Sequence, residues 1–225
     1  MKVKCTNPKH IDSNPSMEVY ENGSYCFSCG YHTSEYTDST AVRKPPTDIN
    51  KELEYIDGLE KREIRGLSLP ADDLGYYITW PDRSYYKKRL YEGKARYIGP
   101  RGHRAPLYRI PGVDPKTLVV VEGEINAITL SNAIGNILTI VSPGSATELT
   151  RHIALYKLYS IVYIVIDRDI PGVINGLKLK DLLLERGRVV HLVAKEKDYN
   201  QILQEEGSDR CKEEAYRDLG LSGRL

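Results

Sequence analysis

Long apolar runs alternate with stretches of helical periodicity in the second half of the chain. They follow in the order LVVVE from Leu118, a helical stretch to about Asn132, ILTIV, a helical stretch to about Leu158, SIVYIVI, a helical stretch from about Val173 to Arg186, and RVVHLV. Strands that are apolar throughout and separated by helices are typical of parallel sheets, because both faces of such sheets are buried. The pattern therefore predicts an α/β domain with a parallel-rich sheet over residues 113–225.

The first half of the chain has a different pattern. Residues 52–112 begin with a short amphipathic stretch, Leu53–Leu67, and continue as Tyr-rich, strand-like pieces broken by Pro and Gly, which indicates a small mixed subdomain. Residues 37–51 are polar, contain two consecutive prolines and lack apolar periodicity, so we interpret them as a linker. Residues 1–36 lack the apolar residues that a core of their own would need.

Metal ligands supply what that missing core would provide. Four residues separate Cys5 from His10, and two residues separate Cys26 from Cys29. Two close pairs of thiolate and imidazole ligands fill a tetrahedral zinc shell, and zinc binding contributes about 10 to 16 kcal/mol to the folding of such modules. We predict a β-rich zinc ribbon over residues 1–36, with a fully occupied shell and hence a structural role.

Two alternatives to this ligand set stay open. His32 follows the ribbon directly and is a competing ligand, although it lies outside the two-pair pattern. A disulfide framework is the weaker explanation, because a reducing cytoplasm disfavours it and a Cys, His, Cys, Cys set leaves an odd thiol. Cys211 stands alone in a charged C-terminal segment, and we expect it to be a free thiol without a role.

Charge becomes informative only when it is resolved along the chain. The 32 Lys and Arg residues against 31 Asp and Glu residues give a net charge of +1, which favours no nucleic-acid partner. Residues 83–104, however, contain eight cationic residues and one acidic residue, a net charge of +7, with Tyr residues interleaved. Such tracks hold phosphate backbones and stack unpaired bases. The alternative is a solvated basic face on which at least half of the tyrosines only fill half-buried strand positions.

Targeting signals are absent from the sequence. No apolar run approaches the length of a membrane span, and the N-terminal MKVKCTNPKH lacks the apolar segment of a secretory signal. We therefore expect a cytoplasmic protein with no membrane partner.

Acidic residues end the two longest apolar runs. LVVV runs into Glu122, and IVYIVI runs into Asp167, Arg168 and Asp169. Because ligands gather beyond the carboxyl ends of parallel strands, we expect these carboxylates to cluster at one edge of the sheet. A bound Mg²⁺ ion would offset their mutual repulsion, since Mg²⁺ binds one or two carboxylates together with substrate phosphates. The alternative, that the acids only cap the helices that follow, explains one such residue better than it explains both strand ends.

Several motifs resemble those of a known fold family. VVVEGEINAI, IVIDRDIPG and KDYN at residues 197–200 resemble the Glu, Asp-x-Asp and Lys-Asp motifs of TOPRIM, a Rossmann-like α/β fold shared by bacterial-type (DnaG-type) primases, topoisomerases and some nucleases. The Cys-His-Cys-Cys segment resembles the zinc ribbon of bacterial and phage primases, and RGLSLP and KARYIGPRGHRAPLY are similar to the basic subdomain that precedes TOPRIM in them. Asn126 stands where the family usually has an Asp, and Asn200 where it often has a second acid, so the number of catalytic metals stays open.

The resemblance implies a DNA primase, a nucleotidyltransferase that copies a single-stranded DNA template into a short RNA primer from nucleoside triphosphates during replication. It implies that Glu122, Asp167 and Asp169 bind the catalytic Mg²⁺ or Mn²⁺ and that Asp198 completes their site, while the zinc ribbon helps to choose the start site. The nucleic-acid or nucleotide contacts that it implies are Arg65, Lys88, Arg89, Arg96 and Tyr97. The sequence has no P-loop, so a replicative helicase partner would be a separate protein.

Two other functions remain open at this point. A TOPRIM nuclease would use the same carboxylates to cleave phosphodiesters. A noncatalytic replication adaptor would bind DNA through the ribbon and the basic track, and Asn126 and Asn200 keep this interpretation open.

Overall fold

The computed structural model describes residues 2–7, 17–20, 23–26, 32–34, 46–92, 97–184 and 188–222. The chain forms two compact units, Met1–Pro45 and Pro46–Leu225. Three of the predicted site residues, His10, Cys29 and Arg96, lie outside the described residues. No helix in the described part of the chain is long and apolar enough to cross a membrane.

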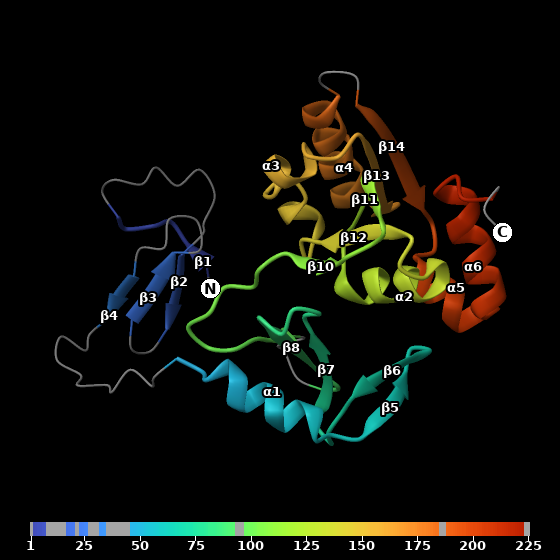
Figure 1. Ribbon diagram of the computed structural model, residues 1–225. Coiled ribbons are helices and arrows are strands. Elements are labelled where there is room, and N and C mark those ends of the chain that lie inside the picture. The colour runs from blue at the N-terminus through green and yellow to red at the C-terminus, as the bar shows by residue number, and fades with distance from the viewer. Residues whose placement is uncertain are drawn as a thin grey trace. The chain divides into compact units, whose positions relative to one another are not determined.

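The described part of the N-terminal unit is an antiparallel sheet (Figure 1). Its strands are β1 (Lys2–Val3), β2 (Met17–Tyr20), β3 (Gly23–Cys26) and β4 (His32–Ser34), paired in that order. Met17 and Cys26 are register partners on adjacent strands, and both are buried. The unit is β-rich as predicted, and the role of zinc in it stays a prediction.

The C-terminal unit begins with a helix and short strands. These are α1 (Ile49–Asp57), the hairpin of β5 (Lys61–Ile64) and β6 (Leu67–Pro70), and the sheet of β7 (Gly75–Thr79), β8 (Tyr86–Leu90) and β9 (Tyr97–Ile98). The carboxylate of Asp48 accepts hydrogen bonds from the first amides of α1, which fixes the start of the helix. The amphipathic stretch that begins at Leu53 therefore becomes one short helix, followed after Gly58 by a hairpin.

A five-stranded sheet forms the centre of this unit. Its order is β10 (Tyr108–Ile110), β12 (Leu138–Ser142), β11 (Asp114–Val121), β13 (Ile161–Asp167) and β14 (Val189–Lys195). Neighbouring strands from β12 to β14 are parallel, and only β10 pairs antiparallel at the edge. The predicted parallel-rich α/β sheet is confirmed.

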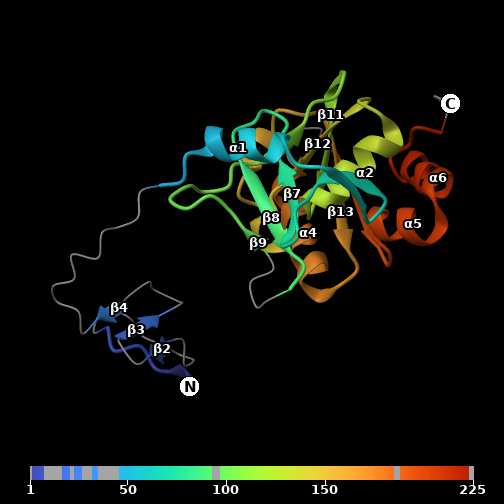
Figure 2. The same cartoon turned by 90° about the horizontal axis from the view of Figure 1, so that it is seen from below.

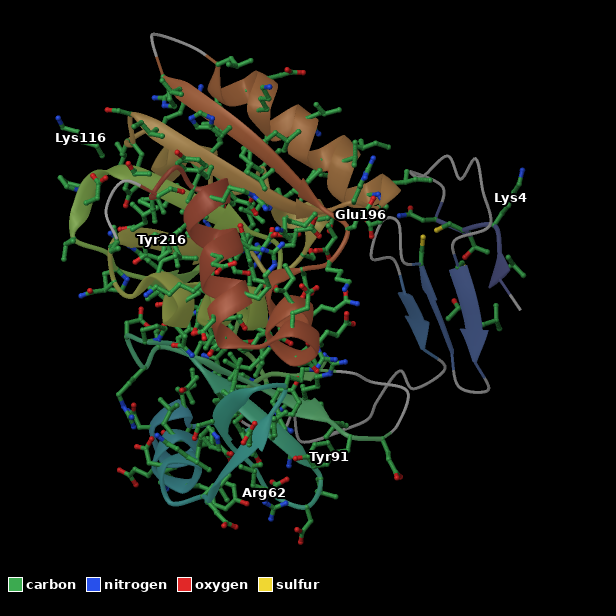
Figure 3. All side chains as sticks on the ribbon, turned by 90° about the vertical axis from the view of Figure 1, so that its right-hand side faces the viewer. Lys4, Arg62, Tyr91, Lys116, Glu196 and Tyr216 are labelled. Carbon is green, nitrogen blue, oxygen red and sulfur yellow. The ribbon has the colours of Figure 1, made fainter. Side chains whose placement is uncertain are left out.

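Helices cover both faces of this sheet (Figures 1 and 2). One face packs against α2 (Glu124–Ile134), α5 (Tyr199–Glu206) and α6 (Ser208–Asp218), and the other against α3 (Ile153–Tyr156) and α4 (Ile170–Leu183). Successive residues of β11 divide accordingly: Val119 and Val121 enter the first core, and Leu118 and Val120 enter the second. Tyr216 of α6 is buried in the first core (Figure 3).

The first core also holds the small strands in place. Trp80, which follows β7, packs edge-on against Tyr108 of β10, with ring centroids 5.0 Å apart, and donates a hydrogen bond to the carbonyl of Pro106. Leu67 and Leu69 of β6 join the same cluster of buried residues. The small strands and the main sheet therefore share one hydrophobic core.

Two helix predictions were wrong in extent. The helix expected to reach Leu158 is instead a short 3₁₀ turn, Ala146–Glu148, followed by the four-residue α3; the turn-forming residues after β12 and the β-branched Thr147 and Thr150 disfavour a continuous helix. The next helix, α4, begins earlier than expected because Asp169 caps it and a proline occupies its first turn.

The charged C-terminal segment forms a helix whose cysteine is buried. Cys211 lies on α6, where it is buried and its thiol faces the carbonyl of Tyr199. The thiol is free, as expected, and it packs in the hydrophobic core.

Candidate active site

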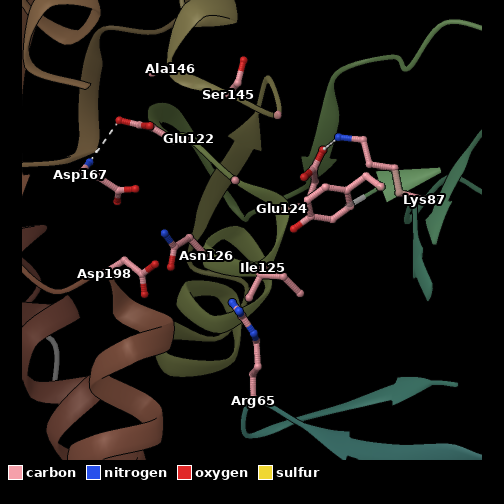
Figure 4. Close-up of a pocket in the computed structure, with 13 residues that line it drawn as sticks. Arg65, Lys87, Glu122, Glu124, Ile125, Asn126, Ser145, Ala146, Asp167 and Asp198 are labelled. Carbon is pink, nitrogen blue, oxygen red and sulfur yellow. Dashed lines mark hydrogen bonds and ion pairs between the residues drawn. The ribbon is translucent and has the colours of Figure 1, made fainter. Parts of the chain in front are cut away.

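Three acidic side chains stand at the carboxyl ends of neighbouring parallel strands. Glu122 directly follows β11, Asp167 is the last residue of β13, and Asp198 lies just beyond β14. All three line one cavity of about 340 Å³. Figure 4 shows Arg65 and Lys87 entering the same space from the β5–β6 turn and from β8. The other lining residues are Tyr97, Gly123, Glu124, Ile125, Asn126, Gly144, Ser145 and Ala146.

The clustered acidic residues also cap helices, so both interpretations of the sequence apply. Oδ1 of Asp169 accepts a hydrogen bond from the amide of Gly172 and caps α4, and Oδ1 of Asp198 caps α5 in the same way. Oε1 of Glu122 accepts from the amide of Asp167, at 3.1 Å. Each bond uses one carboxylate oxygen and leaves the other for a ligand. Asp169 lines a neighbouring hollow of about 230 Å³, which shares Asp167 and Asp198 with the main cavity.

Gly172 allows α4 to begin directly against this acidic edge. A Cβ at this position would lie 2.4 Å from the carbonyl oxygen of Asp167 and 2.6 Å from Oε1 of Glu122. No real Cβ tolerates such distances from backbone atoms, so the closeness of the helix and the carboxylates depends on glycine.

The grouped carboxylates repel one another. Burial, and next the charge of Asp167, raises the pKa of Glu122 to about 7. Burial, followed by the charges of Asp198 and Asp169, also raises the pKa of Asp167. Burial and, to a lesser extent, mutual repulsion thus both disfavour the ionised forms of these carboxylates.

The carboxylate oxygens at this edge are suitable ligands for a divalent cation. Carboxylate oxygens are the ligands that Mg²⁺ and Mn²⁺ prefer, and the raised pKa values show that a positive charge would stabilise the ionised forms. Within the described ranges, no three His, Cys, Asp or Glu side chains converge closely enough to form a ready-made metal site. The residues therefore fit such an ion in type, with the substrate phosphates left to complete its coordination.

The cationic side of the cavity differs from the sequence prediction, because Lys87 lines it and neither Lys88 nor Arg89 does. Lys87 lines the cavity, and its ammonium group lies 2.5 Å from Oε1 of Glu124, the first residue of α2. Lys88 points to the other face of β8, where it forms a mostly buried ion pair with Asp72. Alternate residues of a strand face opposite sides, so Lys88 and Arg89 could not both have faced the cavity. Strand alternation thus places Lys87 with Arg89 and apart from Lys88, whereas the face that meets the cavity depends on how β8 packs.

Of the remaining predicted contacts, some line the cavity and others are buried in the core. Tyr97 lines the cavity with its side chain 43% exposed, and its hydroxyl accepts a hydrogen bond from the guanidinium of Arg89 at 3.0 Å. Arg65 also lines the cavity, and within the described part of the chain its side chain forms no ion pair. Tyr85 and Tyr86 are buried in the core, which bears out the expectation that half of the tyrosines of the basic track have packing roles.

Two further arginines form ion pairs with acids outside the cavity, one in the basic track and one in the acidic motif. Arg83 forms a two-bond ion pair with Asp57 of α1. Arg168, between the two aspartates of the acidic motif, points outward and pairs with Glu196, which Figure 3 labels beyond β14. Arg168 therefore does not compensate the acidic edge.

Comparisons with known proteins identify a fold and no family. No family model matches the chain, and no curated protein matches it. Among solved structures, a chain in a structure of the bacteriophage T7 lagging-strand DNA polymerase interacting with primase domains bound to an RNA/DNA hybrid and dTTP matches with a TM-score of 0.51 and 16% identity, over 70% of this chain and 91% of that chain. This likeness supports a primase-type fold and leaves the function to be argued from the site.

Two further structures match at lower TM-scores. The primase fragment of the bacteriophage T7 primase-helicase protein has a TM-score of 0.49 and 17% identity, over 95% of this chain and 98% of that chain. The zinc-binding and RNA polymerase domains of the Aquifex aeolicus primase have a TM-score of 0.46 and 16% identity, over 96% of this chain and 78% of that chain.

The raised pKa of Glu122 predicts a pH-dependent stability in the absence of divalent cations. Its pKa lies near 7 in the folded chain and near the ordinary value of 4.5 in the unfolded chain, so the folded state binds more protons between these values. The free energy of unfolding should therefore fall as the pH rises from 5 to 8. Denaturant unfolding in a metal chelator should show a shallower fall for Glu122→Gln, and an identical pH dependence in both proteins would contradict this explanation.

Proposed function

We propose that the chain is a DNA primase that synthesises short RNA primers on single-stranded DNA by metal-dependent nucleotidyl transfer. The observation that carries this proposal is one cavity, in a primase-type fold, with carboxylates from three neighbouring strand ends on one side and the cations Arg65 and Lys87 on others. Carboxylates that suit a metal ion and cations that suit phosphates are the two requirements of a nucleoside triphosphate site.

The carboxylates have the metal-binding role in this proposal. Glu122, Asp167 and Asp169 would hold Mg²⁺ or Mn²⁺, with Asp198 completing or orienting the site. A bound ion of this kind stabilises negative charge on the attacking and leaving oxygens of phosphoryl transfer. We also assign to Glu122 the role of accepting the proton of the attacking hydroxyl group.

The cationic and aromatic side chains would hold the substrates. Arg65 and Lys87 face the space in which a triphosphate would lie, and Tyr97 offers a partly exposed ring for a base. Arg89 fixes the ring of Tyr97 through its hydroxyl. Lys87 replaces Lys88 as the proposed phosphate contact of β8, and Arg96 stays a sequence-based candidate. A replicative helicase, where one is required, is a separate partner.

The N-terminal unit would bind structural zinc through Cys5, His10, Cys26 and Cys29 and help to select the start site. The two described ligands support this assignment in type. The amide of Asn7 donates a hydrogen bond to Sγ of Cys5, which favours the thiolate form that binds zinc, and Cys26 ends β3 in a buried position.

Elemental analysis of the purified chain should therefore find one zinc ion per molecule. Cys26→Ser should lose the zinc, because it removes a thiolate from a four-ligand shell, whereas Cys211→Ser should keep it. A zinc content near zero in the unmodified chain would remove the ribbon assignment.

Glu122→Gln should abolish primer synthesis. The substitution keeps the shape of the side chain and removes both its charge and its capacity to accept a proton, so we expect a loss of roughly 10²- to 10⁴-fold. The assay combines single-stranded DNA, Mg²⁺ and labelled ribonucleotides, and Glu54→Gln on the exposed face of α1 is the matched control. Unchanged synthesis by Glu122→Gln would refute its assignment, and a shortened DNA substrate in place of growing products would identify a nuclease.

Lys87→Ala and Lys88→Ala form a second matched pair. Lys87→Ala removes a cation from the cavity and leaves Glu124 uncompensated, so nucleoside triphosphate affinity should fall about 10- to 100-fold, the range expected for a hydrogen bond to a charged group. Lys88→Ala should lower the melting temperature, since it leaves Asp72 unpaired, and should leave the affinity within about twofold. Isothermal titration with a nucleoside triphosphate measures the affinity of both variants, and thermal unfolding measures their melting temperatures. A larger loss of affinity for Lys88→Ala would reverse the assignment.

A further inference from the structure

The turn that carries Arg65 has an unfavourable backbone conformation for its sequence. Arg65 and Gly66 connect β5 to β6 and have φ values of +54° and +72°. Two consecutive positive φ values define the two-residue hairpin turn that favours Asn, Asp or Gly at its first position, because a longer side chain is strained there. An arginine at this position therefore needs stabilisation from elsewhere in the structure.

Asn200, in the first turn of α5, supplies that stabilisation. Its Nδ2 donates hydrogen bonds to the carbonyl oxygen of Arg65, at 2.9 Å, and to Oγ1 of Thr129 on α2, at 3.1 Å. Its Oδ1 accepts from Nε2 of Gln204, at 2.8 Å. The side chain is 1% exposed, so an unmatched polar group here would be costly.

Two further contacts of α5 surround this hydrogen bond, one to α2 and one to the hairpin. The amide of Asn200 donates to Oδ1 of Asn126, which lines the cavity. Gly66 lies against the side chain of Leu203, one turn further along α5, and a Cβ at Gly66 would come within 3.0 Å of it. The tip of the hairpin is thus fixed against α5 by one hydrogen bond and by close packing.

The helix that holds the hairpin begins at an acidic residue of the cavity. Asp198 caps α5 and lies two residues before Asn200, while Arg65 faces the cavity from the hairpin. One buried amide therefore connects the element that carries the acid with the turn that carries Arg65. A carboxylate at position 200 could not donate either bond of Nδ2, which explains why this position is an amide.

We propose that Asn200 is a positioning residue that holds Arg65 in its strained turn at a fixed distance from Asp198, so that nucleotide phosphates can span the acidic and cationic sides of the cavity. This inference rests on the proposed function for the identity of the ligand. The alternative is that Asn200 only satisfies buried polar groups, with no effect on ligand binding.

A double-mutant cycle on nucleoside triphosphate affinity separates these roles. Asn200→Asp should weaken the binding of a ribonucleoside triphosphate with Mg²⁺ about tenfold, the effect of one lost hydrogen bond. In the Arg65→Asn background, Asn200→Asp should have little further effect, because the side chain that it positions is gone. Arg65→Asn alone should raise the melting temperature while it weakens binding, since asparagine suits the turn.

Hydrogen exchange gives a readout that does not require a ligand. Asn200→Asp should speed exchange of the amides of residues 61–70 about tenfold, because it removes the bond that fixes the turn. Asn175→Asp is the matched control: Asn175 lies on α4 and donates to the carbonyl of Pro171 in an exposed position, and its substitution should change neither readout.

Three outcomes would overturn the inference. Equal losses of affinity from Asn200→Asp in the two backgrounds would show a structural role only. Faster exchange without weaker binding would show that the turn is fixed but positions nothing. Failure of the unmodified chain to bind a triphosphate would refute the inference together with the proposed function, whereas binding without primer synthesis would count against the function alone, and the cycle would still decide the role of Asn200.

Discussion

Repulsion among carboxylates gathered at the ends of parallel strands is the constraint on which the C-terminal unit depends. Parallel pairing of β11, β13 and β14 brings Glu122, Asp167 and Asp198 to one edge, whatever their charges. Hydrogen bonds from backbone amides engage one oxygen of Glu122 and of Asp198, and helix dipoles favour the acids that cap α4 and α5. These contacts do not offset burial and the nearby charge of Asp167, which together raise the pKa of Glu122 to about 7.

The cations that face this edge come from a separate part of the chain, so their positions depend on how the small strands are attached to the main sheet. Two attachments are visible. The aromatic packing of Trp80 against Tyr108 fixes the sheet that carries Lys87, and the hydrogen bonds of Asn200 fix the hairpin that carries Arg65. Both attachments lie outside the cavity, yet they determine what faces its carboxylates.

The sheet and its acidic edge could be predicted from the sequence because the signal is local. Four apolar runs define the parallel strands, and an acid that directly follows such a run must lie at the strand end. The choice between Lys87 and Lys88 could not be made from charge alone, because it depends on which face of β8 packs against the main sheet. The contact between Asn200 and Arg65 joins residues 135 positions apart, and no local pattern indicates it. Helices α5 and α6 were not identified because their polar, charged sequences carry only a narrow apolar stripe.

Pairing within the basic track changes what its charge means for a bound polyanion. Arg83, Lys87 and Lys88 each face a carboxylate from another part of the chain, so they already have protein counterions. The salt dependence of nucleic-acid binding reflects the ions released from phosphates by cations that are free to replace them. The eight cationic residues of the track therefore overstate its attraction for a polyanion, and under the proposed primase function nucleic-acid binding should depend less on ionic strength than a net charge of +7 implies.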